Sequence, residues 1–269
     1  MRLLHVTDRL SARGGADWHL LGVLESLVGR GHEVRLAVGR DDGTTAAPCE
    51  VTLVAGLDRT GGGHRVAALD DVAGAFAPDI VHIHNAVSPE ALSWAAERGA
   101  IATVQDHRGF CPGQGKLTMM GEVCRTPMNR DACAGCFTDE GYARRIQDTT
   151  DRRLDALRRM RATTVLSRYM REELGQVGIG NVSVIPPLLH GLDPTAEPSG
   201  PPCVLFAGRL VRAKGIDDAV LAWERSGVNL PLVVAGSGRM RGELERRGVD
   251  VLGWVGHAEM SGVYRRARA

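Results

Sequence analysis

Short apolar runs alternate with amphipathic stretches along the whole chain. The runs are rich in Val, Ile and Leu and contain few polar residues, which is typical of parallel strands that helices cover on both faces. On this pattern we expect strands at 3–7, 33–38, 51–54, 80–84, 101–104, 164–166, 182–185, 204–207, 232–235 and 251–254.

Amphipathic stretches fill the intervals between these strands. The clearest is 18–28, where Leu20, Leu24 and Leu27 share one face before Gly29 and Gly31 end the helix. Regular alternation of strand and helix indicates βαβ units, and therefore an α/β fold of doubly wound parallel sheets. Further helices are expected at 66–76, 89–98, 142–161, 168–177, 216–225, 240–247 and 260–267.

A proline-rich segment divides the chain. Pro186 and Pro187 open a stretch that also carries Pro194, Pro198 and Pro201, so we expect a linker there. The predicted organisation is a Rossmann-like N-terminal domain over 1–187, a linker over 188–202 and a second Rossmann-like domain over 203–269. The second domain has room for only three strands, so its sheet is expected to be incomplete. Either the chain is a truncated product or a partner chain supplies the rest.

Composition narrows the function classes. Apolar residues make up 43% of the chain, enough for buried cores, and a net charge of +1 argues against a general nucleic-acid binder. No run of 18 apolar residues is present, and Asp8 and Arg9 interrupt the first residues too early for a signal peptide. We therefore expect a cytoplasmic protein, whose six cysteines are thiols or metal ligands rather than a disulfide framework.

One segment of the second domain predicts an anion site. The expected strand 204–207 runs into Gly208-Arg209, and Lys214-Gly215 follows just before a helix begins. Free N–H groups at a helix start, a guanidinium that grips oxygens in pairs and an ammonium group together suit a diphosphate. A solvated basic loop is the alternative, and the Walker pattern of phosphate-binding loops is absent.

Two glycine pairs also follow expected strands. Gly14 and Gly15 lie between the first strand and the first helix, where the lack of side chains lets a ligand approach the backbone. Gly236 and Gly238 have the same placement in the second domain. Neither pair completes the Gly-x-Gly-x-x-Gly fingerprint, so a dinucleotide site is only weakly indicated, and ordinary tight turns are the alternative.

The glycine pairs, the basic segment after residue 207 and several further short motifs occur in an order and spacing that resemble glycosyltransferase family 4. Members of this family have the two-domain GT-B fold. The resemblance spans nearly the whole chain and implies transfer of a sugar from a nucleotide-diphosphate sugar to an acceptor, with retention of the anomeric configuration. The acceptor is not specified by the sequence. The matching residues are Gly14-Gly15, Asp79-Ile80-Val81-His82-Ile83-His84-Asn85, Pro112, Ser167, Val184-Ile185-Pro186, Gly208-Arg209, Lys214-Gly215 and Gly236-x-Gly238.

The resemblance implies a donor site. Arg209 and Lys214 match the residues that hold the donor diphosphate in the family. Gly14 and Gly15 match glycines that lie against the same phosphates from the other domain. Fixed cations and backbone N–H groups can stabilise the departing diphosphate without a metal ion.

The resemblance also places residues on the acceptor side. Asp106 and His107 follow the fifth expected strand and are the expected catalytic residues. Gln105 stands where the family often has His, so His107 is expected to serve in its place. The alternative is that Asp106 and His107 only cap the loop.

An acidic pair of the family is missing. Its Glu-x7-Glu pattern, which binds the sugar and ribose of the donor, does not occur in 203–269. The same spacing at Glu25 and Glu33, and at Asp71 and Asp79, lies in the first domain and is rejected as accidental. The alternative function is therefore a non-catalytic nucleotide-sugar-binding or partner protein. An NAD-dependent oxidoreductase and a thiol redox protein are further alternatives with less support.

Four cysteines gather in one long connection, 105–139. Cys111, Cys124, Cys133 and Cys136 follow the pattern Cys-x12-Cys-x8-Cys-x2-Cys, in a segment with little apolar material. Four thiolates with one Cys-x-x-Cys pair suit a structural zinc site. Unligated thiols, disulfides and an iron–sulfur cluster remain open. A similar loop occurs in part of the family, on the acceptor side.

The helix expected at 142–161 carries seven arginines. Asp148 precedes Arg152, and Asp155 precedes Arg159, at the spacing of intrahelical ion pairs, so we expect a solvated face. Peripheral contact with an anionic membrane or an anionic acceptor is the alternative.

Overall fold

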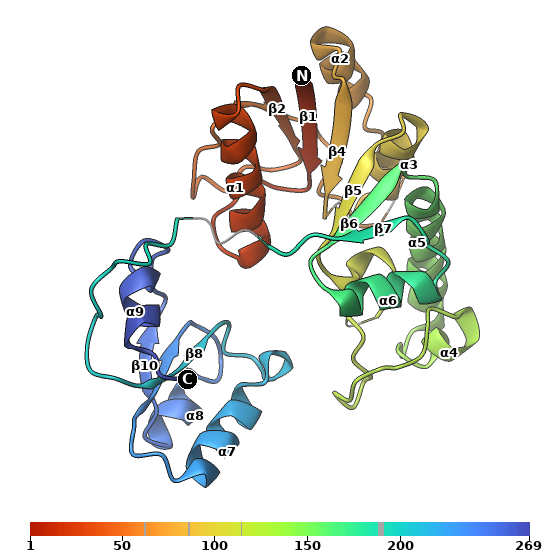
Figure 1. The fold of residues 1–269 in the computed structure, drawn as a ribbon. Coiled ribbons are helices and arrows are strands. Elements are labelled where there is room, and N and C mark those ends of the chain that lie inside the picture. The colour runs from red at the N-terminus through yellow and green to blue at the C-terminus, as the bar shows by residue number, and fades with distance from the viewer. Residues whose placement is uncertain (62, 86, 114, 188–190) are drawn as a thin grey trace. The chain divides into compact units, whose positions relative to one another are not determined.

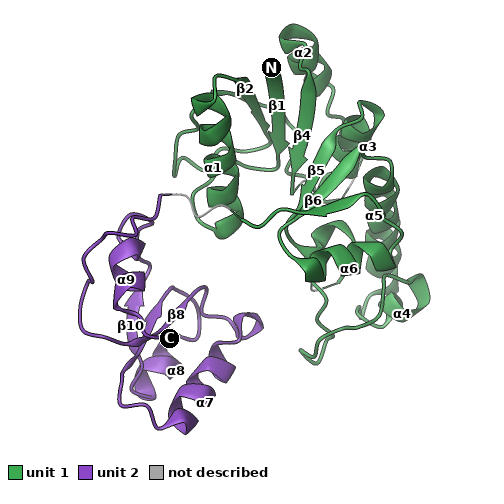
Figure 2. Cartoon of the chain, in the orientation of Figure 1, with its two compact units in different colours: residues 1–190 green, residues 191–269 purple. Residues whose placement is uncertain are grey.

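The computed structural model describes residues 1–61, 63–85, 87–113, 115–187 and 191–269, and these form two compact units (Figures 1 and 2). Unit 1 is Met1–His190 and unit 2 is Gly191–Ala269. Residues 188–190, the start of the expected linker, lie outside the described residues. None of the helices in the described part of the chain has the length and apolarity that a bilayer crossing requires.

Unit 1 is built on a seven-stranded sheet in the order β3-β2-β1-β4-β5-β6-β7. Every pairing in it is parallel, which confirms the expected doubly wound fold. Chain order runs outward from β1 on one side and from β4 on the other, so the topology switches between these two strands. The strands are β1 (Arg2–Thr7), β2 (Glu33–Val38), β3 (Glu50–Leu53), β4 (Ile80–His84), β5 (Ile101–Val104), β6 (Ala162–Val165) and β7 (Val182–Val184).

Helices cover the two faces of this sheet unequally (Figure 1). α1 (Gly15–Gly29) packs through Leu20 and Leu24 against Leu3 and Leu36 on one face. Leu4 points to the opposite face, where the larger core lies, because side chains alternate along a strand. The helices of that second layer are α2 (Ala68–Phe76), α3 (Pro89–Glu97), α5 (Glu140–Arg158) and α6 (Arg168–Gln176).

The cysteine-bearing connection contains two short helices that the apolar pattern did not predict. These are the 3-10 turn η1 (His107–Gly109) and α4 (Arg130–Ala134). Asn129 starts α4 by accepting hydrogen bonds from two backbone N–H groups, which is a local capping effect rather than a packing effect. A single antiparallel bridge between Leu117 and Val123 closes a hairpin.

Unit 2 contains a three-stranded parallel sheet in the order β10-β9-β8. Its strands are β8 (Val204–Ala207), β9 (Leu232–Ala235) and β10 (Asp250–Gly253), and its helices are α7 (Ile216–Ser226), α8 (Arg241–Arg246), α9 (Met260–Arg266) and the 3-10 turn η2 (Arg212–Lys214). Leu210, Ile216 and Leu232 are fully buried at the centre of its core. The residues before β8 pack on α9, where the Ser199 N–H donates to the Gly262 carbonyl at 3.0 Å. The second unit is therefore the smaller one, as expected.

Candidate active site

A pocket of about 110 Å³ lies where β1, β4 and β5 end, beside the start of α1. This is the point at which the strand order reverses, and open α/β sheets bind their ligands at such switch points. Its wall is polar on almost every side. The lining residues are Thr7, Asp8, Arg9, Ala16, Asp17, Leu20, His84, Asn85, Gln105, Asp106 and Arg108.

Arg108 bridges two carboxylates of this pocket. Its Nε donates to Asp106 Oδ2 at 2.8 Å, and its Nη1 lies 3.5 Å from Asp8 Oδ2. Asp106 Oδ1 also accepts from the Arg108 backbone N–H at 2.9 Å and so caps η1. Burial raises the pKa of Asp8, although Arg108 and Arg9 act in the opposite direction. Asp8 is therefore a desolvated carboxyl group suited to accept a hydrogen bond from a ligand hydroxyl.

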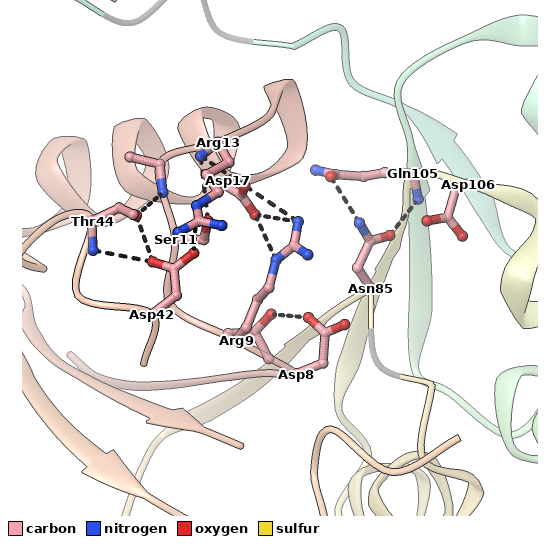
Figure 3. Close-up of polar contacts among 12 residues, drawn as sticks. Asp8, Arg9, Ser11, Arg13, Asp17, Asp42, Thr44, Asn85, Gln105 and Asp106 are labelled. Carbon is pink, nitrogen blue, oxygen red and sulfur yellow. Dashed lines mark hydrogen bonds and ion pairs between the residues drawn. The ribbon is translucent and has the colours of Figure 1, made fainter. Parts of the chain in front are cut away.

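Asp17 holds the glycine loop in place (Figure 3). Its nearly buried carboxylate lies 3.3 Å from Arg9 Nη2 and accepts a hydrogen bond from the Arg13 N–H at 3.2 Å. Arg13 Nε in turn lies 3.2 Å from Asp42 Oδ2. Hydrogen bonding to the Thr44 hydroxyl lowers the pKa of Asp42 to about 2. The carboxylates of Asp17 and Asp42 thus fix the loop before α1.

Asn85 and Gln105 join the ends of β4 and β5. The Gln105 N–H donates to Asn85 Oδ1 at 3.1 Å, and Asn85 Nδ2 donates to Gln105 Oε1 at 3.2 Å (Figure 3). Asn85 has a φ of 46°, in the left-handed region that Asn tolerates better than most residues. Gln105, which stands where the family often has His, therefore has a structural partner.

Backbone conformation and packing do not require glycine at positions 14 and 15. Gly14 is extended, with φ −149° and ψ 167°, a conformation open to any residue. A Cβ added at Gly15 would meet nothing within 4 Å, and one at Gly14 would make only an ordinary contact with Asp17. At both positions the absence of a side chain leaves the backbone accessible.

His107 lies apart from Asp106. Its side chain is not among the lining residues of the pocket, and its Nε2 lies 3.3 Å from the Tyr169 hydroxyl of α6. Its ring meets Phe110 edge-on, and burial lowers its pKa. The structure therefore brings Asp106 to the pocket and turns His107 toward α6 and the cysteine-bearing loop.

Arg209 and Lys214 follow β8 in unit 2, as the sequence predicts. Both side chains are exposed, and within the described ranges neither has a hydrogen bond or an ion pair. The neighbouring Arg212 does have an acidic partner, Asp217, at 3.5 Å. Two exposed cations without acidic partners on one short loop carry positive charge that an anion can neutralise.

The two glycines after β9, Gly236 and Gly238, pack against the backbone of the loop that follows β8. A Cβ at Gly236 would lie 1.8 Å from the Gly208 carbonyl oxygen, and one at Gly238 would lie 2.5 Å from the Leu210 carbonyl oxygen. The Leu210 N–H donates to the Ser237 carbonyl at 2.9 Å. Gly236 and Gly238 are therefore glycines because two loops pack backbone against backbone, and this contact fixes the course of residues 208–210.

The four cysteines of the 105–139 loop line one small pocket of about 20 Å³, room for a single water or ion. The Lys116 N–H donates to Cys111 Sγ at 3.3 Å, and the hairpin returns the chain to Cys124. Burial, followed by the neighbouring thiols, raises the pKa of Cys136. All six cysteines are free thiols.

Sequence reasoning missed Asp8, Arg9 and Arg108 as pocket residues. The signal was available, because Asp8 and Arg9 directly follow the first strand and Arg108 follows the fifth. Polar residues at the carboxyl ends of parallel strands are where ligands of such sheets are expected.

Comparison with known proteins identifies the chain. The family model of Glycosyltransferase Family 4 matches residues 13–191, more than half of the sequence. The chain belongs to glycosyltransferase family 4. It is thus a glycosyltransferase by descent, with the GT-B fold that its two parallel-sheet units show. No curated protein matches the sequence.

Solved structures share this fold at low sequence identity. The catalytic domain of starch synthase IV from Arabidopsis thaliana, bound to ADP and acarbose, has a TM-score of 0.59 and 14% identity over 98% of this chain and 76% of its own. Anabaena Alr3699/HepE in complex with UDP has a TM-score of 0.57 and 13% identity over 96% and 70%. The apo lipopolysaccharide outer core galactosyltransferase WaaB gives 0.52 and 13% over 99% and 71%.

Proposed function

We propose that this family 4 glycosyltransferase transfers a sugar from a nucleotide-diphosphate sugar to a hydroxyl acceptor, with retention. The observation that carries the proposal is the pair of free cations, Arg209 and Lys214, on a loop whose backbone the Gly236 contact fixes. A guanidinium and an ammonium without acidic partners suit a diphosphate. The UDP bound to Anabaena HepE and the ADP bound to starch synthase IV support this class of donor.

The proposed chemistry needs little from the protein beyond electrostatics. As the bond between the anomeric carbon and the phosphate oxygen breaks, negative charge grows on the departing diphosphate. Arg209 and Lys214 stabilise that charge. The acceptor hydroxyl oxygen forms the new bond to the anomeric carbon, and its proton passes to the departing phosphate oxygen. The Gly14–Gly15 backbone is proposed as a phosphate-binding loop of unit 1.

The unit 1 pocket is the proposed acceptor site. Asp106 accepts from Arg108 there and still has lone pairs for a ligand hydroxyl, and Asp8 offers a second carboxyl group. His107 stays a proposed catalytic residue, although it does not line this pocket and its Nε2 lies 3.3 Å from the Tyr169 hydroxyl. The chemistry of the pocket favours a polyhydroxylated acceptor over an apolar one.

A panel of nucleotides tests the donor proposal. We expect UDP, GDP or ADP to raise the Tm of the full chain, and NAD to have no effect. The gain should be lost in Arg209→Ala and Lys214→Ala and kept in Arg225→Ala, an exposed arginine at the end of α7. Stabilisation by NAD alone, or by a diphosphate equally in all variants, contradicts the proposal.

A non-catalytic nucleotide-sugar-binding protein is the second candidate, because exposed cations that suit a diphosphate do not by themselves indicate turnover. Both candidates predict diphosphate binding, so turnover separates them. Release of the free nucleotide diphosphate from UDP-, GDP- or ADP-sugars, in the presence of a panel of sugar acceptors, supports the transferase. Binding without release in every combination supports the alternative.

We also propose that Cys111, Cys124, Cys133 and Cys136 hold a structural zinc ion. Their convergence on one small pocket supports this, and a bound zinc ion would hold the four side chains as thiolates. Metal analysis of the purified chain, with free thiols counted before and after chelation, tests it. The cytoplasmic location, the membrane contact and a partner chain that completes unit 2 stay predictions from the sequence.

A further inference from the structure

Three histidines meet on the face of the unit 1 sheet that α1 covers. The register of β1 and β4 sets His5 opposite His82 and Thr7 opposite His84. Because side chains alternate along a strand, His5, His82 and His84 share one face. The cluster lies directly behind the pocket described above, and His84 is part of the wall of that pocket.

The ring nitrogens are close enough to share one ion. One nitrogen from each of the three rings lies within 4.8 Å of the others. His5 Nδ1 and His84 Nε2 are only 2.9 Å apart, and the two rings are inclined by 20°. Zinc–imidazole bonds of about 2.0–2.1 Å from each nitrogen can span that gap.

The second shell and the access route also suit a metal site. His82 Nε2 lies 2.7 Å from Thr103 Oγ1, the kind of outer partner that orients a ligating imidazole. His5 and His84 are almost fully buried, whereas His82 is partly exposed and leaves a way in.

The cluster has unsatisfied nitrogen atoms. His84 Nδ1 and His19 Nδ1, the latter on α1, are buried without a hydrogen-bond partner in the described part of the chain. Buried polar atoms without partners are rare in native proteins, and here they show that the surroundings of the three histidines offer few hydrogen-bond partners from the described residues.

We propose that His5, His82 and His84 form a binding site for a divalent transition-metal ion of the zinc class. An all-imidazole donor set selects Zn²⁺, Ni²⁺ or Cu²⁺ over Mg²⁺ and Ca²⁺, which require oxygen ligands. On binding, the proton between His5 Nδ1 and His84 Nε2 moves to the other nitrogen of its own ring, so no proton needs to leave the protein. The ion would tie β1 to β4 directly behind the pocket.

This site is separate from the proposed cysteine site, and the two can be told apart in the intact chain. We would add Zn²⁺ to the ¹⁵N-labelled full chain and follow histidine ring nitrogens by NMR. The ring signals of His5, His82 and His84 should move together with one equivalent of the ion. His64, which is exposed in a loop, should not move. If zinc binds and none of the three signals moves, the proposal is overturned.

A variant gives a second measurement. His82→Asn removes the partly exposed ligand and leaves the buried His5–His84 pair intact. We expect it to weaken Zn²⁺ binding at this site by more than the about 10- to 100-fold typical of an outer-shell change. His64→Asn is the matched control. Cobalt(II) separates the sites, because thiolate charge-transfer bands report the cysteines alone. Equal cobalt uptake by the wild-type chain and both variants contradicts the proposal.

Discussion

Arg108 Nη1 lies 3.5 Å from Asp8 Oδ2, so a side chain from the loop after β5 faces the carboxyl group that ends β1. The two residues are 100 positions apart in the sequence, and the sheet order brings them to one pocket. Burial still outweighs this ion pair and raises the pKa of Asp8. A carboxylate kept in an unfavourable environment is typical of functional sites.

Asp8→Asn is expected to raise the Tm of the chain at pH 7. The folded state raises the pKa of Asp8, so it disfavours the charged form that the unfolded chain carries above its ordinary pKa of about 3.9. The gain should shrink as the pH falls and disappear well below the unfolded-state pKa of about 3.9, where the carboxyl group is protonated in both states. Thermal unfolding across this range measures it, and the exposed Asp250→Asn is the control. A lower Tm at pH 7 would show that the Arg108 pairing outweighs burial.

Gly15→Ala should leave folding intact and weaken donor binding. Nothing lies within 4 Å of the added methyl group, so we expect the free energy of unfolding to change by less than about 0.5 kcal/mol. If the loop contacts phosphate, affinity for the stabilising nucleotide should fall about tenfold, or 1.4 kcal/mol. Calorimetric titration beside urea unfolding separates the two effects. An unchanged affinity for the nucleotide in Gly15→Ala would contradict a contact between this loop and the donor phosphates.

Gly236→Ala is expected to do the reverse and destabilise unit 2. Its Cβ would lie 1.8 Å from the Gly208 carbonyl oxygen, so one of the two loops must move. Overpacking of this kind destabilises proteins by about 1–3 kcal/mol, and a clash with backbone belongs at the upper end. Gly242→Ala on α8 is the matched control, since its Cβ would meet nothing and should stabilise the helix by about 0.5–1 kcal/mol. Similar urea midpoints for both variants would refute the backbone contact.

Lys116→Met should destabilise the cysteine-bearing loop. Lys116 Nζ lies 2.9 Å from Glu173 Oε2, and both side chains are almost buried. It also donates to the Thr126 carbonyl at 2.7 Å. Removing one partner of a buried ion pair leaves an uncompensated charge and destabilises by about 3–5 kcal/mol.

The exposed pair Arg241–Glu245 provides the control for that measurement. Arg241→Ala should change the free energy of unfolding by at most about 1 kcal/mol. Urea unfolding of both variants, with thiol reactivity followed in the same samples, tests the prediction. Equal destabilisation, or unchanged thiol reactivity in Lys116→Met, contradicts it.

The sequence predicts the strands well, because a strand buried on both faces of a sheet is a continuous apolar run in the sequence. Every strand of the two parallel sheets coincides with an expected apolar run, although β6 begins two residues early. The short helix α4 was not predicted, because its start depends on one cap, Asn129, and not on an apolar face. The spacing of apolar residues therefore cannot predict a helix in such a segment.

The candidate site could be predicted only in part. Arg209 and Lys214 are close in the sequence, so their shared loop is visible without a structure. The facing of Asp8 and Arg108, and the meeting of His5 with His84, depend on strand order and register, which one sequence does not specify. The sequence also does not specify where the neighbouring Asp106 and His107 side chains point: Asp106 lines the pocket, and His107 Nε2 lies 3.3 Å from the Tyr169 hydroxyl.

In unit 2, backbone contacts between the 208–210 and 236–238 segments fix the course of the loop, and the side chains on it determine what it binds. Main-chain atoms alone make these contacts, through the Leu210 N–H and the two glycines beneath it. Exchanges at Arg209, Ser237 or Arg239 would therefore alter what the surface recognises without redirecting the chain. Natural evolution or laboratory selection can therefore change the nucleotide that these two segments bind by exchanging side chains, provided that Gly236 and Gly238 are retained.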